Sequence, residues 1–542
     1  MSRSAAAVRQ VIKAYDVRGL VGEEIDEGFV ADVGAAFARL VRDEAAAGST
    51  RVAIGYDMRE SSPTLAAAFA DGVTAQGLDV VRIGLASTDQ LYFASGFLDC
   101  PGAMFTASHN PAAYNGIKLC RAGAKPVGED TGLALIRDEV IAGVPAYDGA
   151  RGTVRDQDVL TEYGDFLRSL VNLTDLRPLR VAVDAGNGMA GHTAPAVLGT
   201  IASLTLLPLY FELDGSFPNH EANPLEPANL VDLQRYVAET GADIGLAFDG
   251  DADRCFVVDE RGEPVSPSAI TALIARREVA RAVAQGATAS DVAIVHNVIC
   301  SAQVPEVIAE TGARAVRTRV GHSFIKAEMA RHDAVFGGEH SAHYYFRDFW
   351  FADTGMLAAM HTLAALGEQD APLSVVMGDL HRYAASGEIN STVSDAAAAT
   401  VRVRAWAEGE GVVADERPDV VAEPAGLEHR AAAAAERRGR RRGHDGAGAR
   451  HRARPHPRLT GCGRIRVDRH HPRKDLMSEQ ATPASAIEPW LREILRCPAC
   501  RSELRDDTGP TGGPELVCTS GECGLAYRID NGVPVLLVDE AR

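Results

Sequence analysis

The sequence lacks three features that would each point to a particular class of protein. The sequence contains no run of about 18 apolar residues, which is the length needed to cross a membrane. The segment Met1-Ser-Arg-Ser-Ala-Ala-Ala7 does not resemble a signal peptide. Acidic residues outnumber basic ones, giving a net charge of −19. We therefore expect a cytoplasmic protein with no membrane partner, whose main body does not bind nucleic acid. Cysteine is sparse at nine in 542 residues, and five stand singly: Cys100, Cys120, Cys255, Cys300 and Cys462.

The chain is long enough for several domains, which usually take about 100 to 200 residues each. Three apolar segments begin alike, Arg51–Gly55, Arg180–Val183 and Asp291–Val295, and each opens a strand-then-helix pattern. This pattern predicts consecutive similar α/β domains. Their expected ranges are 1–150, 151–260 and 261–372.

Two short stretches indicate the chemistry of the protein. Thr106-Ala-Ser108-His109-Asn110-Pro111 offers a hydroxyl on a tight turn, and Asp249-Gly-Asp251-Ala-Asp253-Arg254 offers three carboxylates at alternate positions. Such carboxylates can converge on one hard cation, and Mg²⁺ prefers a few of them together with a phosphate oxygen. We therefore predict a phosphoserine at Ser108, held on Mg²⁺ by Asp249, Asp251 and Asp253.

Each stretch has an alternative interpretation. Ser-His-Asn-Pro alone is an ordinary polar turn. The aspartates also fit positions one, three and five of a calcium loop with Glu260 at position twelve, but position six is Arg254 where glycine is needed. The flanks Ile244–Phe248 and Phe256–Val258 also resemble strands, whereas a calcium loop of this kind needs helices. The calcium interpretation therefore fails.

A third stretch, Gly186-Asn-Gly188-Met-Ala-Gly191, matches the spacing of a dinucleotide-binding fingerprint, and Glu212 lies about 20 residues further on. Any strand that turns tightly into a helix favours glycine, so we prefer a structural role for this stretch.

Taken together, these motifs resemble the α-D-phosphohexomutases, in particular the bacterial phosphomannomutase/phosphoglucomutase branch. The resemblance runs from about Ala14 to about Val403. Its ordered matches are Tyr15-Asp-Val-Arg18-Gly19, Thr106 to Pro111 with Asn115-Gly-Ile-Lys118, Asp249 to Arg254, Val320-Gly321-His322-Ser-Phe-Ile-Lys326, and Gly338-Glu339-His340-Ser341-Ala342-His343.

The resemblance implies a role for each matched residue. Ser108 would carry the phosphoryl group, while Arg254, Lys118 and Arg18 would supply positive charge. Lys118 is also a candidate for moving the proton of the attacking hydroxyl, since a lysine crowded by other cations can lose its proton near neutrality. His109 and His322 are alternatives for that step. The implied substrate-binding residues are Tyr15, Arg254, Gly321, Glu339, Ser341 and His343. Ala342 departs from the family, whose members commonly have glycine there.

The implied reaction is a double phosphoryl transfer. The phosphoserine gives its group to a hexose monophosphate, the 1,6-bisphosphate turns over, and its other phosphate returns to the serine. We expect mannose and glucose phosphates as substrates. A phosphoglucosamine mutase, and an inactive mutase body that serves a zinc-binding module, remain alternatives.

Members of the family bind the second phosphate with a loop on a fourth domain. The sequence motif of that loop does not occur in this chain. From about Arg417 to Asp475 the sequence turns to Arg, Ala, Gly, Pro and His without helical or strand periodicity. An arginine-rich tail for nucleic acid is one interpretation. Shifting the reading frame of Glu423 to Gly439 permits Asn-Leu-Arg-Ala-Ser-Asn-Thr-Glu-Pro-Leu-Leu-Arg-Leu-Asn-Val-Glu-Ala, which contains the missing loop. We therefore favour a frame shift between about Gly411 and Asp419.

A second unit begins at Met477, with the cysteine pairs Cys497-Pro-Ala-Cys500 and Cys518-Thr-Ser-Gly-Glu-Cys523. Four thiolates on two such turns can enclose a tetrahedral Zn²⁺. Residues from about Ile487 to Val538 resemble the small zinc-ribbon proteins related to the activating subunit of methyltransferases, although members commonly space the second pair by two residues. The resemblance implies Zn²⁺ and a methyltransferase partner; a metal-free β-rich module is the alternative.

The expected architecture is thus an α/β protein with three similar mutase domains around a central cleft, a disrupted fourth domain and a small β-rich zinc ribbon. Beyond residue 372, the expected ranges are 373–416 for the start of the fourth domain, 417–476 for the frame-shifted segment and 477–542 for the ribbon.

Overall fold

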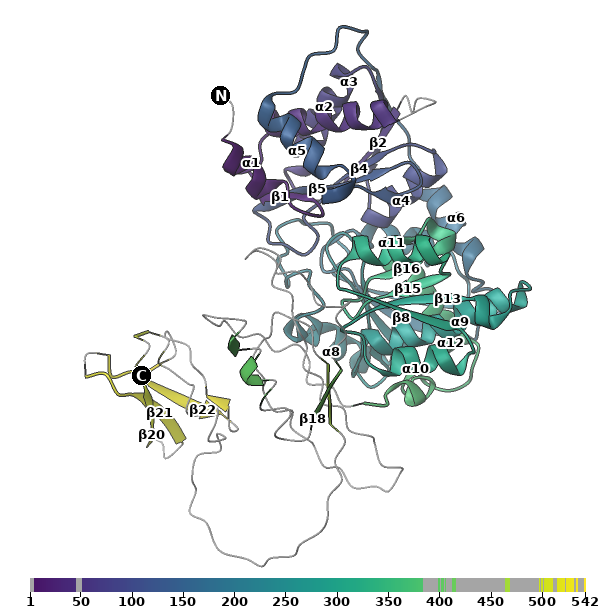
Figure 1. Cartoon of the computed structure of the whole chain (residues 1–542). Helices are drawn as coiled ribbons and strands as arrows, with labels where there is room; N and C mark the ends of the chain where they lie inside the picture. Colours follow the sequence, from purple (N-terminus) through teal and green to yellow (C-terminus); the bar gives the residue numbers. More distant parts are fainter. Residues whose placement is uncertain are drawn as a thin grey trace, which may run out of the picture. The chain divides into compact units, whose positions relative to one another are not determined.

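The structure is a computed structural model with two compact units, Met1–Arg469 and His470–Arg542 (Figure 1). It describes residues 4–44, 51–383, 398–399, 401–403, 405, 412–415, 464–467, 497, 499–500, 502–509, 514–521, 523–530, 533–534 and 541–542.

The first domain of the longer unit is built on a seven-stranded sheet in the order β1-β5-β4-β2-β3-β7, with β6 beside β5. Val52 and Ile54 pack under helices α2, α3 and α5, whereas Ala53 between them joins the core that contains α4. Alternate residues of a strand point to opposite faces, so the sheet is covered by helices on both sides. The strands are β1 (Val17–Leu20), β2 (Arg51–Tyr56), β3 (Asp79–Leu85), β4 (Gly102–Phe105), β5 (Tyr114–Arg121), β6 (Lys125–Pro126) and β7 (Val154–Asp156). The helices are α1 (Ala5–Val11), α2 (Glu27–Glu44), α3 (Ser62–Ala75), α4 (Thr88–Phe97) and α5 (Leu133–Ala142).

The second domain has a five-stranded sheet in the order β12-β11-β10-β8-β9. All five residues of β10 are buried, as expected for a strand that helices cover on both faces. The strands are β8 (Leu179–Asp184), β9 (Leu204–Leu209), β10 (Ile244–Phe248), β11 (Cys255–Asp259) and β12 (Pro264–Val265). The helices are α6 (Leu160–Leu170), α7 (Ala190–Val197) and α8 (Val231–Thr240).

The third domain repeats this plan with the order β14-β13-β15-β16-β17. Helix α11 lies on one face of the sheet, and α9, α10 and α12 lie on the other (Figure 1). The strands are β13 (Ala293–Asn297), β14 (Arg314–Thr318), β15 (Phe336–Gly338), β16 (Tyr344–Phe346) and β17 (Ala352–Asp353). The helices are α9 (Pro267–Ala284), α10 (Gln303–Glu310), α11 (His322–His332), α12 (Gly355–Gly367) and α13 (Leu373–Val376).

One strand pattern recurs in all three domains. The segments that begin alike in the sequence form β2, β8 and β13, the first strand of each pattern. A second and a third strand pair with it in parallel on either side, and a fourth strand pairs antiparallel with the third. The prediction of three similar α/β domains is confirmed by this topology.

Two sheets extend past the domain limits expected from the sequence. Strand β7, at 154–156, pairs with β3 of the first sheet, and β12, at 264–265, pairs with β11 of the second. The chain leaves each domain along an edge strand, so the turn-rich residues at 150 and 260 lie before the last strand pairing.

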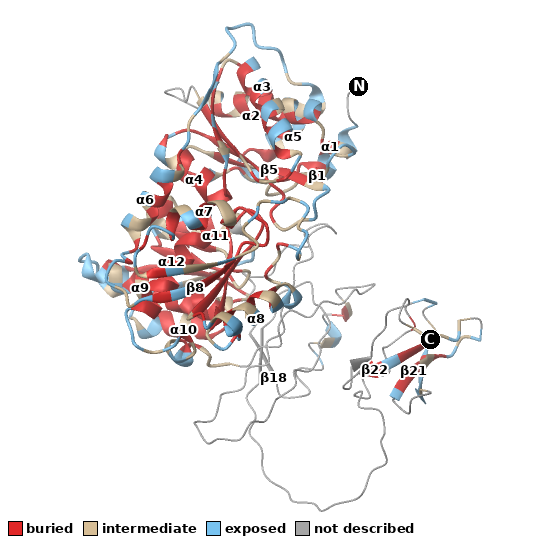
Figure 2. Ribbon diagram, turned by 180° about the vertical axis from the view of Figure 1, so that it is seen from behind, coloured by how far each residue is buried: buried red, intermediate tan, exposed pale blue. Residues whose placement is uncertain are grey.

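A continuous apolar core joins the three domains. It includes the α4 face of the first sheet and both other sheets, from Ala53 through Val183 to Phe336. Buried residues fill the strands and the inner sides of the helices (Figure 2). The three domains are therefore held together by burial of apolar surface and can fix loops from different domains against each other.

Strands β18 (Val412–Asp415) and β19 (Arg464–Val467) pair antiparallel. Because β19 falls inside 417–476, the expectation of no regular element there is wrong for four residues, whose Arg-Ile-Arg-Val alternation is typical of a strand. The hidden loop at Glu423 to Gly439 and most of the expected fourth domain lie outside the described residues.

The shorter unit is a four-stranded sheet in the order β20-β21-β22-β23, and each pair is antiparallel. Its small core includes Leu516, Tyr527 and two of the cysteines. The strands are β20 (Leu504–Thr508), β21 (Pro514–Cys518), β22 (Ala526–Asp530) and β23 (Val533–Pro534).

Candidate active site and cysteine cluster

The motifs that contain Ser108, the three aspartates and Glu339 lie at one recurring position of the fold. In each domain the loop between the third strand and the antiparallel fourth strand carries them: 106–113 between β4 and β5, 249–254 between β10 and β11, and 339–343 between β15 and β16. We call these the serine loop, the aspartate loop and the sugar loop. Each contains one non-glycine residue in the left-handed conformation: Ser108 (φ 50°), Ala252 (φ 60°) and Ala342 (φ 66°).

The serine loop is fixed from beneath by Arg59, a residue that the sequence reasoning missed. Its guanidinium is buried and donates to the carbonyl oxygens of Ser108, at 2.9 Å, and Asn110, at 2.6 Å. It also donates to the carbonyls of Pro111 and Tyr114 and to the carboxylate of Asp57. These bonds restrain the loop around the left-handed Ser108.

The hydroxyl of Ser108 lies against the aspartate loop. Its Oγ donates to Asp249 Oδ2 at 2.7 Å and lies 3.4 Å from Arg254 Nη2. Arg254 is buried and also donates to Asp249, at 2.8 Å. The two motifs, 141 residues apart in the sequence, therefore form one site.

The three aspartates can hold a cation. One ligand oxygen from each of Asp249, Asp251 and Asp253 lies within 4.8 Å of the others, and all three residues are buried. Asp251 Oδ1 and Asp253 Oδ1 are buried without a hydrogen-bond partner. Burial raises the pKa of Asp249 to about 7 although Arg254 lies against it. A cluster of buried carboxylates with unpaired oxygens fits a hard divalent cation such as Mg²⁺.

Lys118 is not surrounded by cations, so the reason given for its proton transfer is wrong. Its Nζ donates to Asp251 Oδ2 at 2.7 Å and to Asp253 Oδ2 at 2.5 Å. Burial alone would lower the pKa of Lys118, but these carboxylates outweigh it and hold the pKa well above its usual value. The sequence could not indicate this, because the carboxylates lie more than 130 residues away.

His109 lies beside Ser108, and Arg18 contacts another residue of the serine loop. His109 Nδ1 is 3.2 Å from Ser108 Oγ and 2.5 Å from Arg254 Nη2. Burial and the Arg254 guanidinium lower the pKa of His109 to about 2, so the ring is neutral and Nδ1 can accept from the arginine. Arg18 donates to the side chain of Asn110 at 2.8 Å and so also contacts the serine loop.

Glu339 of the sugar loop is buried and held by groups that the sequence reasoning did not single out. Its carboxylate accepts from Asn297 Nδ2 at 3.0 Å, from the Gly321 backbone N–H at 3.3 Å and from the Tyr345 hydroxyl at 2.7 Å. Nothing in one sequence identifies Asn297 as a partner of Glu339, since the two are 42 residues apart.

The rest of the sugar loop reaches the aspartate loop. Ser341 Oγ lies 3.2 Å from His343 Nδ1, and His343 Nε2 lies 3.5 Å from Asp253 Oδ1. Arg254 and His343 also form a backbone bridge between the two loops. The structure therefore brings the predicted sugar-binding residues next to the predicted metal ligands.

Tyr15 and Gly321 also meet across two domains. The Tyr15 ring packs edge-on against Phe324, with ring centroids 6.2 Å apart. Gly321 has φ +130°, which only glycine adopts freely, and it precedes helix α11. His322 begins that helix, and its side chain lies outside the described residues.

The glycine stretch that matched a dinucleotide fingerprint has a packing role. A Cβ on Gly188 would lie 2.7 Å from the carbonyl oxygen of Gly250, and the Met189 N–H donates to that same oxygen at 2.9 Å. The stretch thus supports the aspartate loop, in agreement with the structural role preferred from the sequence.

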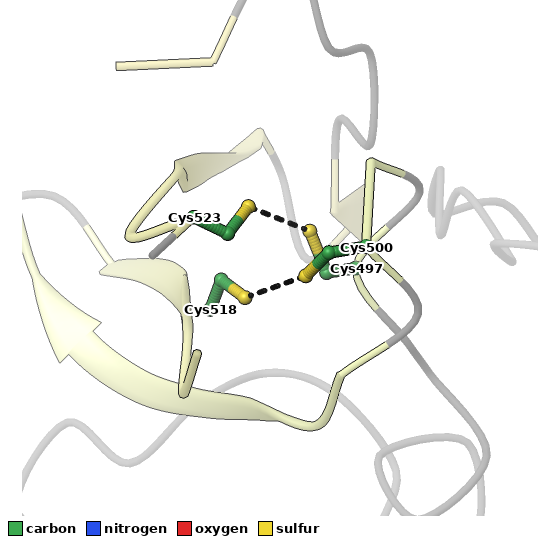
Figure 3. A group of neighbouring side chains, drawn as sticks. All are labelled: Cys497, Cys500, Cys518 and Cys523. Atoms are coloured by element: carbon green, nitrogen blue, oxygen red, sulfur yellow. Dashed lines mark hydrogen bonds between the residues drawn. The ribbon is translucent and has the colours of Figure 1, made fainter. Parts of the chain in front are cut away.

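The four carboxyl-terminal cysteines gather in one cluster (Figure 3). Cys497 Sγ is 3.6 Å from Cys523 Sγ, and Cys500 Sγ is 3.3 Å from Cys518 Sγ. A tetrahedron of thiolates about 2.3 Å from zinc has edges of roughly 3.8 Å, so the cluster fits Zn²⁺. The longer spacing of the second pair does not prevent this convergence.

Among the described residues, no helix is both long and apolar enough to span a membrane.

Three α/β domains whose equivalent loops join a serine, three aspartates and a polar sugar loop define the architecture of a phosphohexomutase. Family profiles agree: the phosphoglucomutase/phosphomannomutase alpha/beta/alpha domains I, II and III match residues 9–142, 161–262 and 266–383. A Trm112p-like profile matches residues 489–532.

Individual relatives lead to the same family. A phosphomannomutase of Salmonella montevideo is 37% identical over 401 residues, which cover 72% of this chain and 85% of that protein. A Xanthomonas campestris protein named for phosphohexose mutases is 37% identical over 395 residues, with the same coverage. A phosphoglucomutase/phosphomannomutase family crystal structure from Burkholderia thailandensis has a TM-score of 0.64 and 30% identity, covering 70% of this chain and 81% of that one.

The chain belongs to the phosphoglucomutase/phosphomannomutase family and carries a Trm112p-like region at its carboxyl end. The predictions of the family, of the fold class and of an enzyme of the isomerase class are thereby confirmed.

Proposed function

We propose that the protein interconverts hexose 6-phosphates and hexose 1-phosphates, with mannose and glucose as sugars, through a phosphoserine at Ser108. The observation that carries this proposal is the bond from Ser108 Oγ to Asp249 Oδ2 at 2.7 Å, inside a buried carboxylate cluster that also meets the sugar loop. A hydroxyl beside such a cluster is suited to phosphoryl transfer, which needs positioning and charge neutralisation more than covalent work by the protein.

The aspartates and the serine phosphate would hold Mg²⁺, which neutralises phosphoryl oxygens when bound. Arg254 lies against both Ser108 Oγ and Asp249 and can orient the phosphoryl oxygens carried by the serine.

In the first transfer a sugar oxygen bonds to phosphorus, the bond from phosphorus to Ser108 Oγ breaks, and the sugar hydroxyl loses its proton. In the second transfer Ser108 Oγ bonds to the phosphorus of the other phosphate, the bond from that phosphorus to the sugar oxygen breaks, and the sugar oxygen regains a proton. Lys118 already carries its proton, because Asp251 and Asp253 hold its pKa well above the usual value, so it supplies charge and does not accept this proton. The neutral ring of His109, beside Ser108 Oγ, is the acceptor we propose.

The sugar loop is suited to gripping a hexose in both orientations. Glu339 is held at a fixed position by three donors: Oε1 accepts from Asn297 and from the Gly321 N–H, and Oε2 accepts from Tyr345. Oε2 therefore keeps a lone pair for a sugar hydroxyl. Ser341 and His343 add donors beside it. The hexose 1,6-bisphosphate is the intermediate that must turn over here.

Phosphorylation of Ser108 tests the proposal. The protein is incubated with glucose 1,6-bisphosphate, and phosphate on Ser108 is followed by tandem mass spectrometry. We expect a phosphoserine and mutase turnover, both lost in Ser108→Ala and both retained in Ser169→Ala, an exposed serine outside the site. A Ser108→Ala protein with most of its turnover would remove the serine from the mechanism.

We further infer that binding of the second phosphate is impaired. The sequence of the fourth-domain loop appears only when residues 423–439 are read in the shifted frame. Turnover should then be slow in comparison with Ser108 phosphorylation. Sequencing the coding DNA and measuring the intact mass of the native protein test this. An open frame without a shift would overturn it.

We propose that the carboxyl-terminal cluster binds Zn²⁺ and that this module contacts a methyltransferase. Support comes from the four converging thiols and the Trm112p-like match. Elemental analysis should find one zinc per chain in the parent and none in Cys500→Ser/Cys518→Ser, with Cys300→Ser as the matched control. Equal zinc in all three would contradict it.

A further inference from the structure

The first turn of helix α4 in the first domain contacts the aspartate loop of the second. Thr88 is fully buried and makes two bonds to one residue: its N–H donates to the Asp251 carbonyl oxygen at 3.0 Å, and its Oγ1 donates to Asp251 Oδ2 at 2.6 Å. Both backbone and side chain of Asp251 are therefore fixed by a residue 163 positions away.

This contact decides which carboxylate oxygen stays free. Asp251 Oδ2 accepts from Thr88 and from Lys118 Nζ, whereas Asp251 Oδ1 is buried and has no hydrogen-bond partner. We propose that Thr88 is a positioning residue that holds the Asp251 carboxylate with Oδ1 turned toward the cation. The inference rests on the proposed Mg²⁺ site.

Thr88 can act in this way because its own helix is anchored. The neighbouring Asp89 carboxylate is buried and accepts from the Tyr163 hydroxyl and the Thr354 hydroxyl, both at 2.7 Å. Thr354 caps helix α12 of the third domain, and Ser87 caps α4 itself. A junction of all three domains thus fixes the first turn of α4.

The other neighbours of the aspartate loop add to this support. A Cβ on Gly355, the first residue of α12, would lie 2.7 Å from the Arg254 carbonyl carbon. Met189, which caps α7, donates to the Gly250 carbonyl oxygen. Of these contacts, the Thr88 hydroxyl is the one that reaches a ligand carboxylate. Partners of metal ligands typically contribute 10- to 100-fold in metal affinity.

Mn²⁺ binding, followed by electron paramagnetic resonance of the free ion, tests the inference without using activity. Thr88→Val removes the hydroxyl at nearly constant shape and keeps the backbone N–H. We expect its Kd for Mn²⁺ to rise about tenfold or more, with Thr88→Ser close to the parent. Thr88→Ala is the second variant in case the valine disturbs folding, and the same rise is expected.

Tyr163→Phe is the matched control. It removes a buried hydrogen bond of the same junction without touching a metal ligand, so the urea midpoint should fall while the Kd for Mn²⁺ stays within twofold. A folded Thr88→Val or Thr88→Ala protein with the Kd of the parent overturns the role of Thr88 and leaves the proposed function standing. A parent protein that binds no Mn²⁺ at the aspartates overturns the proposed metal site itself.

Discussion

The serine loop and the sugar loop occupy the same place in their domains, yet they use it differently. Each follows a third strand and contains a left-handed non-glycine residue, Ser108 in one and Ala342 in the other. In the serine loop the proposed nucleophile is itself the left-handed residue. In the sugar loop the left-handed residue only makes the turn, and the polar groups flank it. The repeated fold supplies a position for a loop, whereas the side chains supply its chemistry.

The supports of the two loops differ in the same way. Arg59 holds the serine loop through backbone carbonyls, so it restrains the path of the chain. Asn297 and Tyr345 hold the sugar loop through the Glu339 carboxylate, so they restrain one side chain. Changes to the first support should therefore cost more than changes to the second.

The largest effect is expected for Arg59→Lys. A single ammonium cannot serve four carbonyls and a carboxylate, and disrupting a buried charged network typically costs about 3–5 kcal/mol. We expect the urea midpoint to fall and turnover to drop about 100-fold. Arg82→Lys, at an exposed ion pair with Asp156, is the control and should change neither. Parental turnover in Arg59→Lys would show that the serine loop holds its shape without this clamp.

A smaller effect is expected for Glu339→Gln. The charge is lost but the shape is kept, and a hydrogen bond to a charged group contributes about 1.5–3 kcal/mol. The KM for hexose phosphate should therefore rise roughly tenfold to hundredfold in steady-state assays, with little change in stability. Glu328→Gln, on the outer helix α11, should leave KM unchanged. An unchanged KM in Glu339→Gln would mean that the sugar loop does not grip the sugar through this carboxylate.

The junction of the three domains at the first turn of α4 should make stability depend on pH. Burial raises the pKa of Asp89 to about 6, against the hydrogen bonds that it accepts. A raised folded-state pKa stabilises below the unfolded value of 3.8 and loses that contribution as pH rises through about 6. This amounts to on the order of 3 kcal/mol between pH 4 and pH 7.5.

Urea unfolding at pH 4 and pH 7.5 measures this dependence. Asp89→Asn should lose much of the difference between the two pH values, whereas Asp370→Asn, at an exposed site, should retain it. Identical pH profiles for the parent and Asp89→Asn would exclude Asp89 as the titrating group.

The smallest effect is expected for Ala342→Gly, at the left-handed position of the sugar loop. A left-handed alanine costs about 1–2 kcal/mol, partly offset by the extra freedom of glycine in the unfolded chain. We expect a gain of up to about 1 kcal/mol in urea unfolding. Ala358→Gly in helix α12 should instead lose about 1 kcal/mol. Equal losses in both variants would show that the turn at Ala342 carries no strain.

Much of the site could be predicted because its residues come in contiguous motifs. Asp249, Asp251 and Asp253 lie on one loop, so their spacing alone indicates a shared cation. Arg59, Thr88 and Asn297 could not be predicted in this way. Each is an ordinary polar residue in the sequence and gains its role only through burial against a loop from a distant part of the chain.

The surroundings of Lys118 could not be predicted either, although the residue itself lies in a recognisable motif. Its motif identified it as a site residue, but its electrostatic surroundings come from Asp251 and Asp253 of the next domain. The sequence therefore indicated the motif that contains Lys118 but not the carboxylates that surround it.

The order of strands and helices, the motifs and the cysteine pairs were determined by the sequence itself, because apolar periodicity and ligand spacing are local properties of a chain. Which carboxylate oxygen is free, which arginine clamps the serine and how His109 loses its charge were decided by the tertiary structure alone. Burial and electrostatic interaction depend on distances in space, and the domains that set those distances are joined only by folding.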